Sequence, residues 1–182
     1  MNINQSLTRR SLVKAAFATS LLSLAPSLAY SFGKLETRSL YLYNTHTGES
    51  LQKVYWEKGL YINEALKDIN YILRDFRTHD VRAIDTNLLD LMYMIHAKME
   101  TTKPFEIISG YRSPKTNQML HKKTTGVAYN SNHLIGKAID VRLSCRPLKS
   151  LRDTAIAMQQ GGVGYYPKSD FVHIDTGGVR YW

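Results

Sequence analysis

Cysteine is almost absent from this sequence, because Cys145 is the single one among 182 residues. An intramolecular disulfide is therefore excluded, even in an oxidising compartment that would permit one. Apolar residues make up 43% of the chain, enough for one core of ordinary size. We therefore expect one domain whose stability comes from its core and from any metal ion that it binds.

A long hydrophobic run is also missing. The uncharged apolar stretch over 15–25 is shorter than the roughly 20 residues of a membrane-spanning helix. Paired arginines at positions 9 and 10 precede this stretch, and small residues at 27 and 29 follow it, which is typical of an export signal. We therefore predict a signal over residues 1–29, cleaved at its end, and a mature domain over 30–182 without a membrane span.

The paired arginines indicate the twin-arginine export route, although the general secretory route accepts the same residues. Either route predicts an exported, periplasmic protein. Acidic residues are scarce, 15 against 24 lysines and arginines. The predicted signal contains three basic residues and no acid, so its removal lowers the formal charge from +9 to +6. This excess suits an anionic partner such as a cell-wall polymer or a lipid surface. No Lys/Arg block or aromatic–basic motif is present, so we expect no nucleic-acid partner.

Periodicity predicts an α+β fold. Alternating apolar and polar residues over 38–56, broken by turn residues at 44–48, indicate a β-hairpin. Helical spacing and start and stop signals predict helices over 62–77, 86–98 and 147–160. Short apolar segments predict strands over 105–109, 138–143, 163–166 and 171–175, with a loop over 124–132. We therefore expect a single domain with helices packed on a mostly antiparallel sheet.

Three residues have the chemistry of a zinc site: His133, Asp140 and His173. Imidazole nitrogen and carboxylate oxygen suit zinc, and three protein ligands leave a fourth position for water, as in catalytic sites. The chain must fold back between His133 and Asp140, and Gly136 is the residue best able to allow this, because it takes positive φ at little cost. Each residue alone would also fit an ordinary structural role.

Asp170 and Arg112 are the candidate catalytic residues. Asp170 precedes His173 by three positions, so a regular strand would point the two to opposite sides, and we expect Asp170 at the strand entrance. Its predicted role is the general base that takes a proton from the attacking water; the alternative is a turn cap. Arg112 would hold a substrate carboxylate or a developing oxyanion, or form a structural salt bridge. Ser131 is a candidate substrate contact, and Asp175 a candidate to orient a ligand.

The pattern Ser-x-His-x-x-Gly-x-Ala-x-Asp, followed by Asp-x-x-His and preceded by Ser-Gly-Tyr-Arg-Ser, resembles the D-Ala-D-Ala metallopeptidase group of the LAS peptidases (lysostaphin, D-Ala-D-Ala metallopeptidase, hedgehog). Within that group it is similar to the YcbK-like branch of exported murein endopeptidases. The likeness runs from Leu35 to Trp182 and includes the closing Gly-Val-Gly-Tyr-Tyr-Pro and Val-Arg-Tyr-Trp runs.

The resemblance implies a hedgehog-like zinc peptidase fold, with zinc held by His133, Asp140 and His173, an acidic base at Asp170 and an arginine at Arg112. Many relatives have glutamate where this chain has Asp170, whose carboxylate is one bond shorter. The implied substrate is a peptide bond in peptidoglycan stem peptides or their cross-links. A D-alanyl carboxypeptidase with the same metal site and an inactive zinc-bearing wall-binding module are the alternatives.

Overall fold

The structure of the protein is a computed structural model that describes residues 37–124 and 126–182. The predicted export signal over 1–29 and the predicted start of the mature domain at residue 30 lie outside these residues. No helix in the described part of the chain combines the length and the apolar composition needed to cross a membrane.

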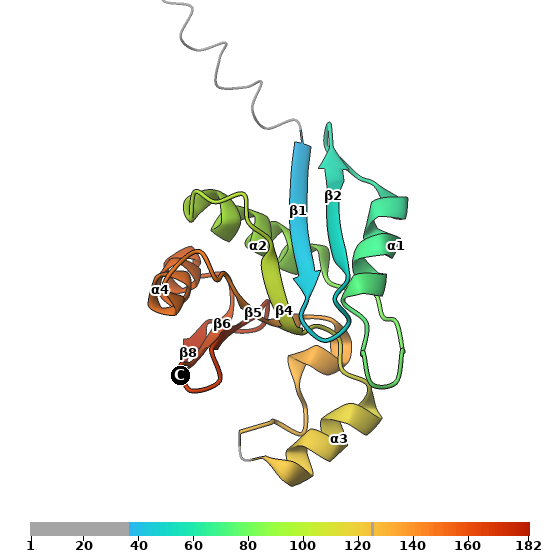
Figure 1. The fold of residues 1–182 in the computed structure, drawn as a ribbon, viewed down its shortest axis with the longest axis vertical. Coiled ribbons are helices and arrows are strands. Elements are labelled where there is room, and N and C mark those ends of the chain that lie inside the picture. The colour runs from blue at the N-terminus through green and yellow to red at the C-terminus, as the bar shows by residue number, and fades with distance from the viewer. Residues whose placement is uncertain (1–36, 125) are drawn as a thin grey trace, which may run out of the picture. The chain divides into compact units, whose positions relative to one another are not determined.

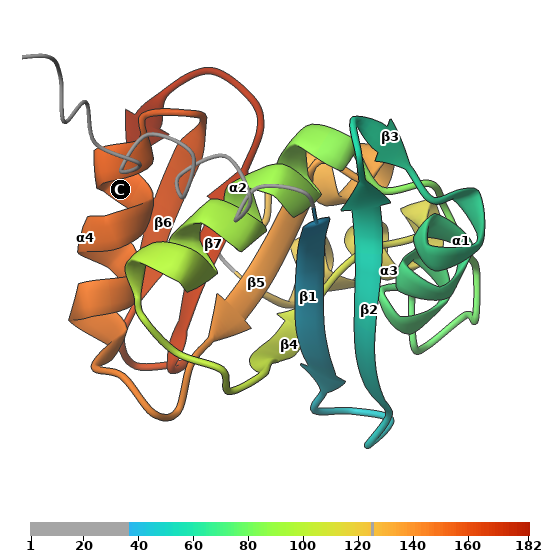
Figure 2. The ribbon, with the colours of Figure 1, turned by 90° about the horizontal axis from the view of Figure 1, so that it is seen from above.

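Within the described residues, eight strands form one sheet in the order β3-β2-β1-β4-β5-β7-β6-β8 (Figure 2). Neighbouring strands run antiparallel, except that β1 pairs with β4 and β6 with β8 in parallel. The expected α+β fold with a mostly antiparallel sheet is therefore confirmed. The strands are β1 (Thr37–Asn44), β2 (Ser50–Glu57), β3 (Leu60–Tyr61), β4 (Phe105–Ser109), β5 (Ala138–Arg142), β6 (Gly162–Tyr166), β7 (Phe171–Asp175) and β8 (Arg180–Tyr181).

Helices lie on both sides of this sheet (Figures 1 and 2). They are α1 (Asn63–Ile72), α2 (Thr86–Lys98), α3 (Pro114–Lys123), α4 (Leu148–Met158) and a short 3₁₀ helix, η1 (Asn132–Ile135). Helix α2 contacts β1 and α4, and α4 contacts β6 and β7, so these two helices cover one face. Helix α3 lies on the opposite side, and η1 contacts β5.

Successive side chains along β5 and β7 point alternately to the core face and to the opposite face of the sheet. Ile139 and Val141 on β5, and Ile174 on β7, are buried in the hydrophobic core under α2 and α4. Because successive strand side chains point to opposite faces, Asp140 and His173 lie on the side away from that core. The sheet therefore presents polar chemistry on one face and packs the core on the other.

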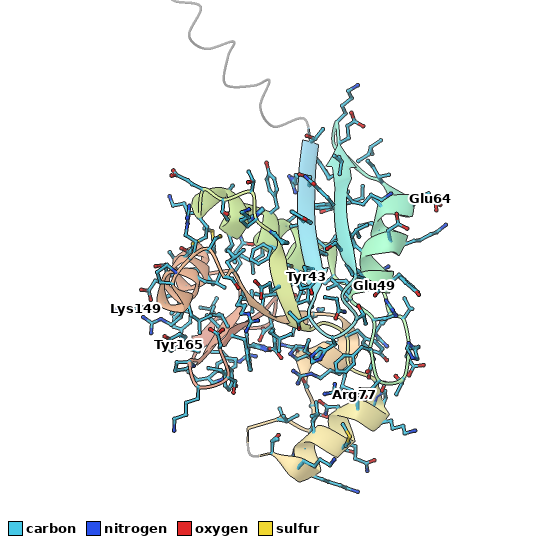
Figure 3. All side chains as sticks on the ribbon, viewed as in Figure 1. Tyr43, Glu49, Glu64, Arg77, Lys149 and Tyr165 are labelled. Atoms are coloured by element: carbon cyan, nitrogen blue, oxygen red, sulfur yellow. The ribbon has the colours of Figure 1, made fainter. Side chains whose placement is uncertain are left out.

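Helix α1 is shorter than the predicted 62–77, because it ends at Ile72. Its buried stripe includes Ala65 and Ile69, while Glu64 points away from the sheet (Figure 3). Beyond the helix, Arg74 pairs with Glu49 at 2.9 Å. Polar side chains of this segment thus bind neighbouring elements instead of continuing the helical pattern.

Helix α3 was not predicted. Its sequence, PKTNQMLHKK, carries little apolar periodicity, and its buried residues are the polar Thr116 and Asn117. Start signals are nevertheless present, because the Ser113 side chain caps the helix and Pro114 occupies its first turn. The two-residue strands β3 and β8 were also missed, because two residues are too few for an alternating pattern.

Candidate metal centre

The three predicted ligands come together from three segments. Asp140 on β5 lies directly opposite His173 on the neighbouring β7, and His133 lies in η1. Gly136 ends η1 in the left-handed region at φ 71°, and a Cβ there would lie 2.3 Å from the Ala83 carbonyl oxygen. A glycine is therefore needed where the chain turns from His133 back towards Asp140, as the sequence predicted.

The donor atoms of the three side chains form a small triangle. His133 Nε2 lies 3.2 Å from His173 Nδ1 and 3.3 Å from Asp140 Oδ1. His173 Nδ1 lies 2.9 Å from the same Asp140 oxygen. Ligands of a tetrahedral zinc ion stand about 3.4 Å apart, given bonds of about 2.0 to 2.2 Å. The group therefore fits a metal ion with shifts of a few tenths of an ångström.

The second nitrogen of each imidazole has an acceptor that fixes the ring. His133 Nδ1 donates to the Gly110 carbonyl oxygen at 2.7 Å, and His173 Nε2 donates to Asp175 Oδ2 at 2.9 Å. Both partners leave the other nitrogen lone pair facing the triangle, which is the arrangement that metal-binding histidines use. The position of Asp175 agrees with the predicted orienting role.

The carboxylate of Asp175 is held by several hydrogen bonds besides the one from His173. It is completely buried, and it accepts hydrogen bonds from the backbone N–H groups of Gly162 and Gly177 and from Arg180. Burial alone would raise the pKa of Asp175, but the hydrogen bond from His173 and these other donors hold it well below its usual range. Asp175 therefore stays ionised and fixed in position.

The charge of His133, Asp140 and His173, called the metal group below, favours the binding of a cation. Burial alone would raise the pKa of Asp140, but the adjacent histidines and Arg112 hold it well below its usual range. Burial lowers the pKa of His133, which keeps its imidazole neutral. Burial would also lower the pKa of His173, but hydrogen bonds to two carboxylates raise it. The donors are therefore the neutral imidazole of His133, the imidazole of His173 and the single ionised carboxylate of Asp140, a set that suits a divalent metal.

Arg112 and Ser131 both lie beside this group. The Arg112 Nη2 donates to Asp140 Oδ2, and its Nε donates to Ser109 Oγ at 2.8 Å. Its Nη1 has no hydrogen bond within residues 37–124 and 126–182, and the side chain lines a cleft. Ser131 lines the same cleft, and its hydroxyl caps η1 by accepting from the backbone N–H of His133.

Asp170 occupies the entrance of β7, as expected, with a left-handed φ of 54°. Its carboxylate does not join the metal group; it accepts from Arg142 Nη1 at 2.9 Å and is 63% exposed. Arg142 follows Asp140 by two positions on β5, so the two lie on the same face of the sheet. Asp170 thus starts from the same face of the sheet as the three predicted ligands, where it pairs with Arg142, and it is not among the residues that line the cleft.

The cleft over the metal group has a volume of about 600 Å³. One wall comes from the segment between α3 and η1, and the other comes from the β6–β7 turn and the last residues of the chain. The second wall contains Tyr166, Phe171, Arg180 and Trp182, none of which the sequence analysis assigned to the site. The aromatic residues in the closing runs of the sequence, which contributed to the resemblance, are the feature from which this wall could have been predicted.

Comparison with known proteins agrees with this geometry. One family, described as peptidoglycan L,D-endopeptidase MepK, matches residues 33–182. The chain belongs to this family. The protein named peptidoglycan L,D-endopeptidase MepK from Escherichia coli (strain K12) is 43% identical over 155 residues, covering 84% of this chain and 85% of the relative. A probable peptidoglycan L,D-endopeptidase MepK from Haemophilus influenzae (strain ATCC 51907 / DSM 11121 / KW20 / Rd) is 37% identical over 183 residues, covering 100% of this chain and 98% of the relative.

Membership of the MepK family makes this chain a peptidase, and the predicted resemblance to the YcbK-like branch is confirmed. The family is metal-dependent, and His133, Asp140 and His173 are the group in the described residues that can hold the ion. A cleft of the kind that binds ligands lies directly over that group.

Proposed function

We propose that this chain is a zinc-dependent murein endopeptidase that hydrolyses peptide bonds in peptidoglycan stem peptides or their cross-links. The convergence of His133, Asp140 and His173 under a cleft, in a member of the MepK family, carries this proposal. The names of the two relatives support peptidoglycan as the substrate. The excess of basic residues supports an anionic wall polymer as the partner.

Zinc is the proposed ion because two imidazole nitrogens and one carboxylate oxygen are a common catalytic zinc set. We expect one zinc per chain by elemental analysis, and loss of that zinc in His173→Ala. The matched control is His96→Ala, since His96 Nε2 contacts the Lys103 carbonyl oxygen away from the metal group. Unchanged zinc stoichiometry in His173→Ala would contradict the ligand assignment.

The side chains around the group have distinct proposed roles. Zinc, when bound, would supply Lewis acidity that polarises the scissile carbonyl and favours deprotonation of a water molecule. Asp170 turns from Arg142 to accept the proton of the attacking water, then returns it to the leaving amine nitrogen. Arg112 donates through Nη1 to the carbonyl oxygen or to a substrate carboxylate, and Ser131 contacts the substrate backbone. Asp175 is unsuited to the proton transfer, since it is buried and engaged.

We further propose that residues 1–29 direct export, and that the enzyme acts in the periplasm, where its polymer substrate lies. The arginines at positions 9 and 10 support the twin-arginine route for this signal.

Digestion of purified sacculi, with and without a chelator, followed by mass analysis of the released fragments, tests the proposal. We expect cross-linked fragments to disappear in the absence of chelator and to persist in its presence. Release of terminal D-alanine from uncross-linked stems would identify a carboxypeptidase instead. Binding to sacculi without any release would identify an inactive wall-binding module.

A further inference from the structure

Trp182 lies in the wall of the cleft beside the metal group. The centroid of its indole is 5.4 Å from that of the His173 ring, and it lines the cleft together with Tyr166 and Phe171. Half of its surface, 50%, is exposed. A large aromatic ring that is half covered by protein therefore presents its remaining surface next to the reaction centre.

The indole is fixed in this position by several contacts. Its Nε1 donates to the Tyr166 hydroxyl at 2.7 Å, and the Arg180 guanidinium carbon lies 5.1 Å from the ring centroid. The Trp182 backbone continues the pairing beside β6, because its N–H donates to the Val163 carbonyl oxygen and its own carbonyl oxygen accepts from Tyr165. The ring thus has little conformational freedom left to lose when a ligand covers it.

Gly164 on β6 makes room for the ring. A Cβ at Gly164 would lie 2.6 Å from Cε2 of the Trp182 indole, which is closer than real Cβ contacts allow. The strand therefore approaches the indole with bare backbone at the residue that pairs with His173. Single exposed apolar residues are common on protein surfaces. This indole differs from them, because it is held by a hydrogen bond, packs against a glycine and lines a cleft.

We propose that Trp182 is a substrate-contact residue, whose exposed indole surface packs on the stem-peptide residue that adjoins the scissile bond. This inference rests on the proposed function. An extended residue spans about 3.3 to 3.6 Å, so at 5.4 Å from the His173 ring the indole reaches the neighbouring residue and not the distant glycan. Aliphatic side chains and peptide planes both pack well on an aromatic face.

Kinetics on a soluble cross-linked stem-peptide dimer test the contact. We expect Trp182→Ala to raise KM roughly tenfold, with kcat within about threefold and the metal content unchanged. Trp182→Phe should recover part of the loss, because it keeps an aromatic face without the hydrogen bond to Tyr166. Gly164→Ala should resemble Trp182→Ala, because the added Cβ displaces the indole. An unchanged KM in Trp182→Ala would overturn the proposal, and loss of the metal would assign Trp182 to supporting His173 instead.

Fluorescence gives a second readout that is independent of turnover. The chain contains two tryptophans, so Trp182 is the only tryptophan in Trp56→Phe and can be excited selectively at wavelengths that tyrosine does not absorb. Trp56 lies on β2, at the other end of the sheet from β6 and β8. On rapid mixing of the metal-loaded variant with the dimer, we expect a saturable emission change before cleavage. A flat signal with a dimer that is cleaved would overturn the contact. If the wild type left the dimer uncut, the proposed function would fail, while the emission titration would still decide whether peptide reaches Trp182.

Discussion

The two carboxylate oxygens of Asp140 have different neighbours. Its Oδ1 lies beside the donor nitrogens of His133 and His173, and its Oδ2 accepts from Arg112. The guanidinium is therefore attached to the metal group through a ligand, while its Nη1 remains available to the cleft. The two roles that the sequence left open for Arg112, salt bridge and substrate contact, are compatible in one side chain.

The proposed role of Asp170 as the general base can be tested by Asp170→Ala. We expect activity to fall by about 10²- to 10⁴-fold, the usual contribution of general acid–base catalysis. Metal content should not change, and the free energy of unfolding should fall by no more than about 1 to 2 kcal/mol, because the carboxylate is 63% exposed, exposed ion pairs contribute only about 0 to 1 kcal/mol, and alanine tolerates the left-handed backbone of this residue less well than aspartate. Asp153→Ala is the matched control, since Asp153 is an exposed aspartate paired with Arg152 on α4. An active Asp170→Ala enzyme would mean that another group takes the proton.

The elements that the sequence predicted are those in which one repeating pattern decides the structure. The hairpin of β1 and β2, helix α2 and strands β4 to β7 follow apolar alternation or helical spacing, and each forms close to its predicted bounds. Helix α3 has no apolar stripe, because it buries the polar residues Thr116 and Asn117. Asn117 donates to two carbonyl oxygens in the loop before η1. Such long-range polar contacts leave no periodic trace in a sequence.

Asp75 connects the segment that follows α1 with the start of α3. Its carboxylate accepts from the backbone N–H of Ser113 at 2.8 Å and from that of Arg77 at 2.9 Å, so it ties the segment after α1 to the start of α3. Asp75→Asn removes the charge and sets an amide donor against these donors. We expect it to lower the free energy of unfolding at pH 7 by about 1 to 3 kcal/mol, measured by urea denaturation, whereas the exposed Asp80→Asn should have little effect.

The pH dependence of that difference follows from the same carboxylate. Burial alone would raise the pKa of Asp75, but hydrogen bonds from Thr116 and Ser113 lower it below its usual value. A lowered pKa in the folded state means that the stabilisation is present above the unfolded pKa, about 3.9, and is lost as the pH falls through the folded pKa. The difference between wild type and Asp75→Asn should therefore shrink below about pH 4. A constant difference down to pH 2 would show that charge has no part in it.

For the molecule as a whole, the metal group links parts of the chain that are far apart in sequence. His133 and Asp140 lie 40 and 33 residues before His173, and the sheet brings them together on the face away from the core. The convergence of these three side chains could be predicted because their types and spacings form a compact pattern. The aromatic wall could not, because it depends on the parallel pairing of β8 with β6, which local sequence does not specify.

A metal ion that binds the three ligands should therefore stabilise the entire fold. An ion that binds the native chain alone, at a free concentration of 1,000 times Kd, adds about 4 kcal/mol. In a domain of this size each kcal/mol raises Tm by about 2 to 4 °C, so we expect saturating zinc to raise Tm by roughly 8 to 16 °C in differential scanning calorimetry. His133→Ala and His173→Ala should lose this rise, and His96→Ala should keep it. An equal rise in the two ligand variants would mean that zinc stabilises the protein from a different site.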